Sequence, residues 1–219
     1  MWHDELESLK KWDLSLDRRL LWRFSHSITI TSMSGVGGSS TLKALREILN
    51  RQDYRFVSGG DAMRYFAKEV GMSIEDFAVY VREHPEHGYD RKIDEMLKKA
   101  GETNRLVAES RLVHGLIPGA FHVLLTCDPL IRATRRRRVE AYRNLSVENV
   151  AKLLIQRDAA NNLRFSDLYT GYNWNEKDYD FVQSTDSESA SPLDRARQIV
   201  IEHYRWKSRI AKEGIRLVD

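Results

Sequence analysis

A run of glycines and hydroxyl residues lies between an apolar segment and a helical one, and its composition suits the binding of phosphate. Residues 27–41 read SITITSMSGVGGSST, and four apolar residues after them have helical spacing: Leu42, Leu45, Ile48 and Leu49. Glycines let backbone N–H groups turn toward an anion, and a helix N-terminus adds partial positive charge. A buried turn capped by a serine is the alternative. The residues expected to hold phosphate are Gly35, Val36, Gly37, Gly38, Ser39 and Ser40.

This segment matches the known phosphate-binding patterns only in part. Against G-x-x-x-x-G-K-[ST], it has Ser32 at the first glycine, Gly38 at the lysine and Ser39 at the hydroxyl that binds Mg²⁺. Lys43 comes five residues after the lysine position, inside the expected helix. Against the dinucleotide pattern G-x-G-x-x-G, Ser40 replaces the third glycine. The loop therefore lacks the usual cation.

Arginines further along the chain could supply positive charge around a phosphoryl group. Arg132 precedes the run RRRR at 135–138, and Arg157 and Arg164 are spaced to share one face of an expected helix. A guanidinium stays charged and binds phosphate through two N–H groups. Phosphoryl transfer needs mainly positioning and charge neutralisation from a protein. A solvated basic stripe is the alternative for any single arginine.

The composition is that of an ordinary water-soluble globular domain. The chain has 219 residues, of which 42% are apolar and 31% charged, with a net charge of +3. This mild charge does not by itself indicate nucleic acid as a partner. The single cysteine, Cys127, excludes an intramolecular disulfide, and no apolar run approaches membrane-spanning length. We expect a cytoplasmic protein without a signal segment.

Five strand patterns separated by helices must position these groups, and they predict an α/β fold with a mainly parallel sheet. The expected strands are the run around Ile28 and Ile30, then 54–58, 106–108, 121–127 and 179–182. The expected helices are the one from Leu42, then 61–70, 73–83, 89–100, one from Pro129, 147–169 and 192–203. Residues 1–26 have leucines three or four apart among charges, and we expect a helical appendage there that packs on the body or on a second subunit as a homodimer.

From Ser27 to about Thr185 the chain resembles cytidylate kinases of the archaeal type, which are P-loop nucleoside monophosphate kinases. The segments that carry the resemblance are SGVGGSST, VSGGDAMRYFAKEVGMSIEDF, VAESRLVHGLIP, DPLIRATRRRR and RDAANNLRFSDLYTGYN. The resemblance implies a P-loop NTPase-type three-layer fold with a five-stranded sheet over residues 27–219. It also implies an acceptor-binding insert at about 59–104 and a lid at about 132–172.

The resemblance further assigns roles to single residues. Three would line the acceptor nucleotide pocket: Ser58, Asp61 and Arg64. Arg111 would bind the acceptor phosphate, although Ser110 occupies the position where the family has glycine. Arg132 and Arg136 would face the donor phosphates, and Arg157 and Arg164 match the family's lid-to-core arginine pair. Taken alone, Asp61 could instead cap a helix, and Glu109 could be an ion-pair partner of Arg111 or a ligand of magnesium-bound water.

These inferences predict a kinase that moves the ATP γ-phosphoryl group to CMP or dCMP. Ser39 would ligate Mg²⁺, and the four arginines of the lid would neutralise the transferred group: Arg132, Arg136, Arg157 and Arg164. Either an arginine from 132–138 replaces the missing lysine, or the chain is a nucleotide-binding regulatory protein with little catalysis. A third alternative, a dinucleotide-dependent oxidoreductase, is weakened because the strand at 54–58 has no acid at its end.

Overall fold

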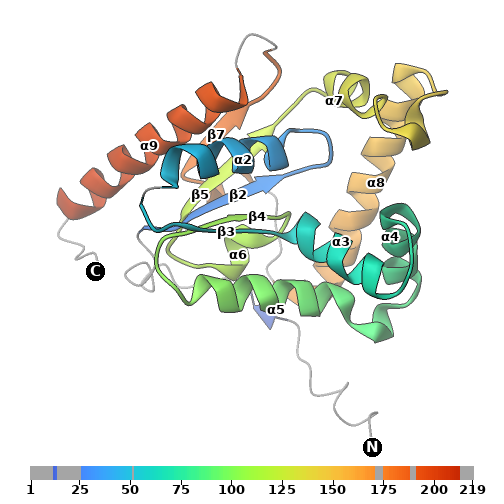
Figure 1. Cartoon of the computed structure of the whole chain (residues 1–219), viewed down its shortest axis with the longest axis horizontal. Coiled ribbons are helices and arrows are strands. Elements are labelled where there is room, and N and C mark those ends of the chain that lie inside the picture. The colour runs from blue at the N-terminus through green and yellow to red at the C-terminus, as the bar shows by residue number, and fades with distance from the viewer. Residues whose placement is uncertain (1–11, 14–25, 51, 171–174, 188–190, 213–219) are drawn as a thin grey trace, which may run out of the picture.

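A parallel five-stranded sheet forms the centre of the molecule (Figure 1). The computed structural model describes residues 12–13, 26–50, 52–170, 175–187 and 191–212. The strands follow the order β3-β4-β2-β5-β7 across the sheet. Their bounds are β2 Ile28–Ser32, β3 Arg55–Ser58, β4 Leu106–Glu109, β5 Phe121–Thr126 and β7 Phe181–Ser184. The predicted α/β fold with a parallel sheet is therefore confirmed.

Helices cover both faces of this sheet because its strand side chains alternate between two apolar layers. Val107 of β4 packs in the layer of α2 (Gly38–Leu49) and α9 (Pro192–Lys212). Its neighbours Leu106 and Ala108 pack in the layer of α5 (Tyr89–Gly101) and α6 (Val113–Leu116). The core thus has one apolar cluster on each side of the sheet.

Strand β2 lies at the point where the chain changes direction across the sheet. After β2 the chain forms β3 and β4 on one side, and β5 and β7 lie on the other. In open parallel sheets, ligands bind beyond the carboxyl ends of the strands at such a switch point. The glycine-rich segment follows the carboxyl end of β2 directly.

Two groups of helices extend from this edge of the sheet (Figure 1). The first follows β3 and consists of α3 (Gly59–Glu69), α4 (Ile74–Glu83) and α5. The second follows β5 and consists of α7 (Pro129–Arg136) and the long helix α8 (Val147–Leu168). Side-chain caps fix where four of these helices begin, namely Ser58 at α3, Ser73 at α4, Asp128 at α7 and Ser146 at α8. The assignment of an acceptor-binding insert at about 59–104 and a lid at about 132–172 stays a prediction.

Several sequence-based expectations were wrong in detail. Strand β7 begins two residues later than expected, because residues 176–178 form a 3₁₀ turn and Phe181 pairs with Val123. Helix α9 continues nine residues past His203 to Lys212, since Trp206 and Ile210 extend its buried face. The four-residue helix α6 was not expected.

The N-terminal segment is described only at its strand and at its end. Trp12–Asp13 form β1, which pairs in parallel with β6 (Tyr169–Thr170), so the helical prediction is wrong at these two residues. The rest of the proposed appendage up to residue 25, and a dimer contact through it, lie outside the described residues. Among the helices that are described, none is both long and apolar enough to cross a membrane.

Candidate functional site

The glycine-rich loop leaves the start of α2 open to an anion. Gly35 and Gly37 have φ values of +82° and +109°, in the left-handed region that favours glycine. No side chain caps α2, whose N-cap is Gly37, or α5, whose N-cap is Gly88, whereas α3, α4, α7 and α8 have a side-chain cap. The N–H groups of the first helical turn have no partner inside a helix. The uncapped start of α2 argues against the serine-capped turn, and its place at the switch point of the sheet suits a phosphate cradle.

Side chains from the other half of the sheet hold the carbonyl groups of this loop. The Nε of Arg132 donates to the carbonyl of Ser34 at 2.9 Å. The hydroxyl of Thr185, after β7, donates to the carbonyl of Val36 at 2.7 Å, and Nη1 of Arg135 lies 3.4 Å from the same oxygen. These bonds fix the carbonyls against α7 and the end of β7, and so set the orientation of the loop peptides.

A buried carboxylate lies against the position where the phosphate-loop pattern has lysine. Glu109, at the end of β4, accepts hydrogen bonds from Ser32 at 3.0 Å and from Ser58 at 3.1 Å. A Cβ atom on Gly38 would lie 2.1 Å from the Ser32 hydroxyl and 2.6 Å from Oε1 of Glu109. Any side chain at position 38 would therefore collide with this group.

The environment of Glu109 acts on its protonation in two directions. Burial raises the pKa of the Glu109 carboxyl, while the hydrogen bonds from Ser32 and Ser58 and the charge of Arg111 act to lower it. The net direction is upward, because desolvation is the largest cause. The sequence marked Glu109 only as an alternative and gave no sign of its contact with Gly38, which is 71 positions away in the chain.

The residues predicted on the acceptor side gather around the end of β3. Ser58 accepts from the backbone N–H groups of Gly60 and Asp61, so Ser58 rather than Asp61 is the cap of α3. Asp61 instead pairs with Arg64 at 2.5 Å, and both side chains are more than half exposed. Arg111 is half-buried and acts electrostatically on Glu109. Their roles toward an acceptor nucleotide stay predictions.

The lid arginines divide into two sets. Arg132 is buried and its Nη2 donates to Asp158 of α8 at 2.6 Å, which ties the lid helices together. Arg136 lies beside the loop, with its Cγ 3.0 Å from where a Cβ on Gly35 would be, and its guanidinium is 5.3 Å from the ring centre of Tyr142. Both arginines thus lie beside the glycine-rich loop, and Arg132 has one partner in the loop, Ser34, and one on α8, Asp158. Their roles toward donor phosphates stay predictions.

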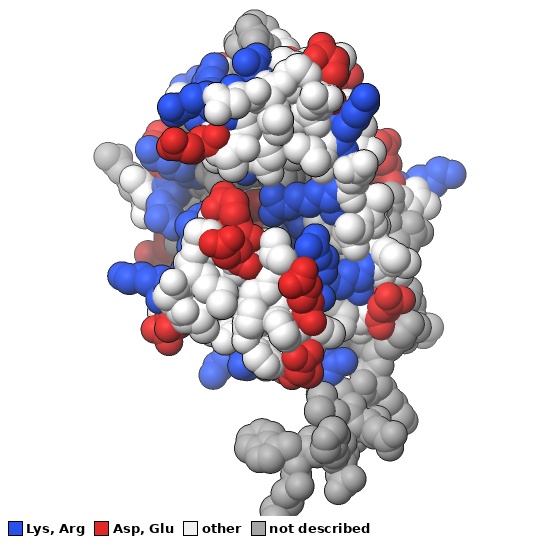
Figure 2. All heavy atoms as spheres, turned by 90° about the vertical axis from the view of Figure 1, so that its right-hand side faces the viewer, with Lys and Arg blue, Asp and Glu red and all other residues white. Residues whose placement is uncertain are grey.

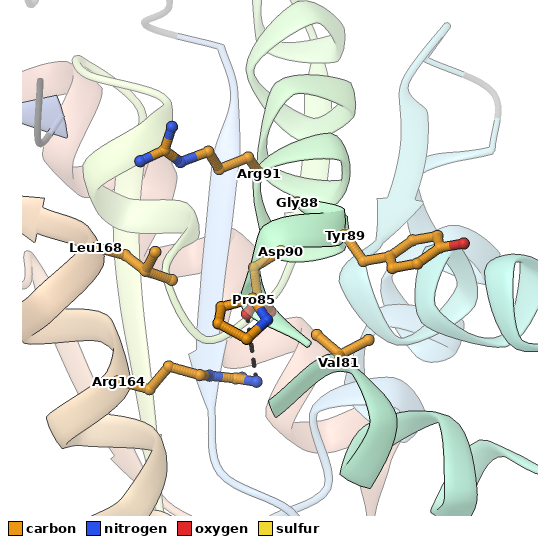
Figure 3. Close-up of a pocket in the computed structure, with 8 residues that line it drawn as sticks. All are labelled: Val81, Pro85, Gly88, Tyr89, Asp90, Arg91, Arg164 and Leu168. Atoms are coloured by element: carbon orange, nitrogen blue, oxygen red, sulfur yellow. Dashed lines mark ion pairs between the residues drawn. The ribbon is translucent and has the colours of Figure 1, made fainter. Parts of the chain in front are cut away.

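The second set lies further along α8. Arg157 is half-buried on this helix, one residue before Asp158. Arg164 forms an ion pair with Asp90 of α5 at 3.2 Å, and both side chains are mostly buried. Figure 3 shows this pair in a pocket that is also lined by Val81, Pro85, Gly88, Tyr89, Arg91 and Leu168. Arg164 therefore contacts α5, which lies in the predicted acceptor-binding insert, and the sequence did not single out Asp90.

A second buried acid lies one turn along α5 from Asp90. The Tyr169 hydroxyl donates a hydrogen bond to Asp94. The pKa of Asp94 is raised to about 7, mainly by burial and in part by the charge of Asp90, while the hydrogen bond from Tyr169 acts to lower it. Together with Arg164, these groups connect α5 to the end of α8 and to β6.

Viewed from the side of the lid and acceptor helices, the surface is hollowed, and arginine and lysine side chains border the hollow with some acidic ones (Figure 2). In the described part of the chain, no three His, Cys, Asp or Glu side chains converge as a metal site would require. Two groups remain as candidate ligands for a cation. They are the exposed hydroxyl of Ser39, in the first turn of α2, and the carboxylate of Glu109 next to Gly38. Such a sparse set suits Mg²⁺, which keeps several waters and binds substrate phosphates.

Comparison with known proteins places these features in a family. No protein-family model matches the chain. It is 30% identical over 175 residues to the cytidylate kinase of Pyrococcus abyssi, an alignment covering 80% of this chain and 94% of that enzyme. It is 31% identical over 163 residues to the cytidylate kinase of Thermococcus sibiricus, covering 74% and 81%. The chain belongs to the cytidylate kinase family.

Another relative has a different name and is much longer. An S-adenosylmethionine-dependent nucleotide dehydratase of Lacinutrix mariniflava is 33% identical over 187 residues, which are 84% of this chain and 37% of that protein. The chain thus spans little more than a third of this relative. It is similar to both kinds of protein over most of its own length.

Solved structures agree with the fold of a cytidylate kinase family member. A shikimate kinase from Bacteroides thetaiotaomicron aligns with a TM-score of 0.53 and 17% identity, covering 84% of this chain and 98% of that one. A shikimate kinase from Acinetobacter baumannii aligns with a TM-score of 0.51 and 14% identity, covering 84% and 95%. The chain has the fold of the P-loop kinases, and its family is one of nucleoside monophosphate kinase-like phosphotransferases.

Proposed function

We propose that this protein transfers the γ-phosphoryl group of ATP to CMP or dCMP. The observation that carries the proposal is the uncapped start of α2 at the switch point of the sheet, with arginines of α7 beside it. An anion there meets open N–H groups and positive charge together. The cytidylate kinases among its relatives support the cytosine nucleotide as acceptor.

On the donor side, the backbone N–H groups of residues 37–40 hold the phosphates, while the Val36 N–H donates to the carbonyl of Met33 at 3.2 Å. The Cγ atom of Arg136 lies against Gly35 while its guanidinium lies over Tyr142, from where it would turn toward the phosphates, and Arg157 would act from α8. The hydroxyl of Ser39 and, through water, the carboxylate of Glu109 would hold Mg²⁺, which neutralises charge on the phosphate oxygens when bound. Arg132 keeps the loop carbonyl of Ser34 in place and so positions the peptide groups that bind phosphate.

On the acceptor side, Ser58, Asp61 and Arg64 contact the nucleoside monophosphate, and Arg111 binds its phosphate. Arg111 follows β4 and lies near Glu109, so the acceptor phosphate would lie next to the donor phosphates. Arg164 contributes by joining the lid to the acceptor helices through Asp90. The enzyme's task is to align two phosphorylated substrates and neutralise their charge.

A catalytically weak nucleotide-binding protein is the second candidate, and one observation favours it. The lysine position is occupied by Gly38 and closed by Ser32 and Glu109. A buried carboxylate beside the phosphate cradle opposes triphosphate binding unless a cation or a proton offsets its charge. In this case the protein binds Mg-ATP but transfers its phosphoryl group slowly.

The test combines nucleotide binding with an acceptor screen. We expect Mg-ATP to raise the melting temperature, and [γ-³²P]ATP to label CMP and dCMP faster than UMP, AMP or GMP. Gly37→Ala should abolish the melting shift because Gly37 is a left-handed loop residue. Gly71→Ala is the control, since Gly71 has a similar φ of +70° but stands in open space away from the loop.

The outcomes separate the candidates. Binding of Mg-ATP without labelling of any monophosphate would support the weak nucleotide-binding protein. Faster labelling of another monophosphate would replace the cytosine acceptor. The absence of any Mg-ATP shift, together with tight NAD(P)H binding, would contradict both candidates.

A further inference from the structure

An arginine of α9, in a distant part of the chain, also reaches the glycine-rich loop. Nη2 of Arg195, on α9, lies 3.8 Å from where a Cβ on Gly37 would be. Arg195 is only 7% exposed. It is 158 positions from Gly37 in sequence, and α9 packs beside α2 on the same face of the sheet (Figure 1). Position 195 was not among the residues that the sequence singled out.

Arg135 approaches the same loop from α7. Its Nη1 lies 3.4 Å from the carbonyl of Val36, the residue before Gly37, and its Nη2 donates to the carbonyl of Thr185 at 2.5 Å. The charge of Arg135 acts on Arg195 by repulsion. Burial is the largest cause that lowers the pKa of Arg195, and the repulsion by Arg135 is the next. Two guanidinium groups from different helices therefore converge on adjacent loop residues.

Such an arrangement concentrates positive charge at the loop. Two like charges close together in a mostly buried place repel each other. The charge of Asp194, next to Arg195 in sequence, acts to raise the pKa of Arg195 but does not cancel the lowering by burial and by Arg135. A polyphosphate against the N–H groups of Gly37 and Gly38 would bring several negative charges within reach of Arg195.

The crowding around Gly38 favours a cation from outside the loop. A lysine at position 38 would have its Cβ 2.1 Å from the Ser32 hydroxyl, so Ser32 and Glu109 would have to move to admit it. Arg195 reaches the preceding residue, Gly37, from α9, and requires no space at position 38.

We propose that Arg195 binds the phosphates of the donor nucleotide at the glycine-rich loop and supplies the charge that the loop itself lacks. The ligand is a nucleoside di- or triphosphate, and Arg135 positions the loop by holding Val36. The proposal rests on the proposed function in one respect, namely that the loop binds a nucleotide donor.

The test compares Arg195→Gln with Arg197→Gln. Arg197 lies two residues away on the same helix, is 61% exposed and pairs with Asp194, so both substitutions remove one positive charge from α9. Calorimetry measures the dissociation constants of Mg-ATP, Mg-ADP and AMP. We expect Arg195→Gln to raise the dissociation constants of Mg-ATP and Mg-ADP by roughly tenfold and that of AMP by much less. We expect Arg197→Gln to change none of the three constants.

An equal loss of affinity for all three nucleotides in Arg195→Gln would show that Arg195 has only a structural role. Unchanged affinities would exclude Arg195 as a phosphate ligand. If Arg195→Gln does not fold, Arg195→Lys keeps the charge but loses the bidentate geometry, and an intermediate affinity for Mg-ATP is then expected. The wild type separates the two claims. Unchanged Mg-ATP binding in Arg195→Gln overturns this proposal alone, whereas a wild type that binds no nucleotide overturns the proposed function.

Discussion

At the scale of single residues, the surroundings of Gly38 limit which side chain the phosphate loop can accommodate at this position. The sequence alone left open whether a lysine at this position would restore a missing charge. The contacts of Gly38 with Ser32 and Glu109 give a different expectation, because even a methyl group would overlap the Ser32 hydroxyl. The glycine is therefore part of the packing between β2, β4 and α2.

We predict that Gly38→Lys will not raise kcat, and that Gly38→Ala will lower the free energy of unfolding by about 1 to 3 kcal/mol through overpacking. Urea denaturation and steady-state kinetics with Mg-ATP and CMP would measure both effects. Gly60→Ala is the matched control, since a Cβ at Gly60 would have its nearest neighbour at 3.4 Å. A tenfold rise of kcat in Gly38→Lys, about 1.4 kcal/mol of activation free energy, would contradict this prediction.

The arginines should separate kinetically according to the substrate that each one touches. We predict that Arg64→Ala and Arg111→Ala raise the KM for CMP and leave the KM for ATP nearly unchanged. Arg157→Ala should mainly lower kcat, since its proposed contact strengthens as charge develops on the transferred group. Arg82→Ala, an exposed arginine of α4, is the control for loss of positive charge. A change confined to the KM for ATP in Arg64→Ala or Arg111→Ala would reverse the assignment of the two sides.

Asp94 should make stability depend on pH. Burial raises the pKa of its carboxyl from 3.8 to about 7 in the folded protein. Between these two values the folded state holds more protons than the unfolded state, so the free energy of unfolding falls as pH rises from about 4 to about 7. Urea denaturation at several pH values should show this fall in the wild type, and a smaller one in Asp94→Asn. An Asp94→Asn variant with the wild-type slope would exclude Asp94 as its source, and Glu95→Gln controls for the lost charge on α5.

At the scale of elements, α8 joins the lid to the acceptor helices through two mostly buried ion pairs. Arg132 of α7 pairs with Asp158 near the middle of α8, and Arg164 near its end pairs with Asp90 of α5. Helix α8 thus has one ionic contact with α7 and one with α5. A movement of α7 and α8 would therefore act on α5 through this helix.

We predict a coupling free energy of about 1 to 2 kcal/mol between Arg164 and Asp90 in a double-mutant cycle measured by urea denaturation. Their low exposure, 20% and 17%, reduces screening by solvent. The exposed pair Arg197–Asp194 on α9 is the control cycle, and we expect about 0.5 kcal/mol or less there. Equal coupling in both cycles would mean that α8 is not held to α5 by this pair.

At the scale of the whole molecule, the fold was largely predictable, whereas the site was predictable only in part. Strands such as β4 and β5 are short apolar runs between polar turns, and their number and separation by helices indicated the parallel sheet. The glycine-rich loop was evident because glycine and serine at these positions have few other uses between a strand and a helix.

The remaining parts depend on contacts between distant segments. Nothing near Gly38 in the sequence reveals that Glu109 packs against it, and nothing in α9 marks Arg195 as a neighbour of Gly37. Likewise, the sequence does not distinguish Asp90 from the other acids of its helices. Only the fold shows that Arg164 of α8 pairs with it. A helix of four residues such as α6 is too short to show a period.

The central position of β2 has a consequence for the order in which the substrates bind. The residues proposed for the acceptor belong to the β3 and β4 half of the sheet, and the loop carbonyls are held from the β5 and β7 half. Under the proposed function, each substrate would therefore bind to its own half of the sheet. We predict random addition of ATP and CMP to form a ternary complex.

Initial-rate measurements with both substrates varied should give intersecting double-reciprocal lines, and isotope trapping should capture enzyme-bound ATP and enzyme-bound CMP alike. Parallel lines would indicate a phosphorylated enzyme instead, and trapping of only one substrate would indicate that the second pocket forms after the first is filled. With random addition, the cell's ratio of ATP to CMP would set which binary complex predominates without changing the route of the phosphoryl group.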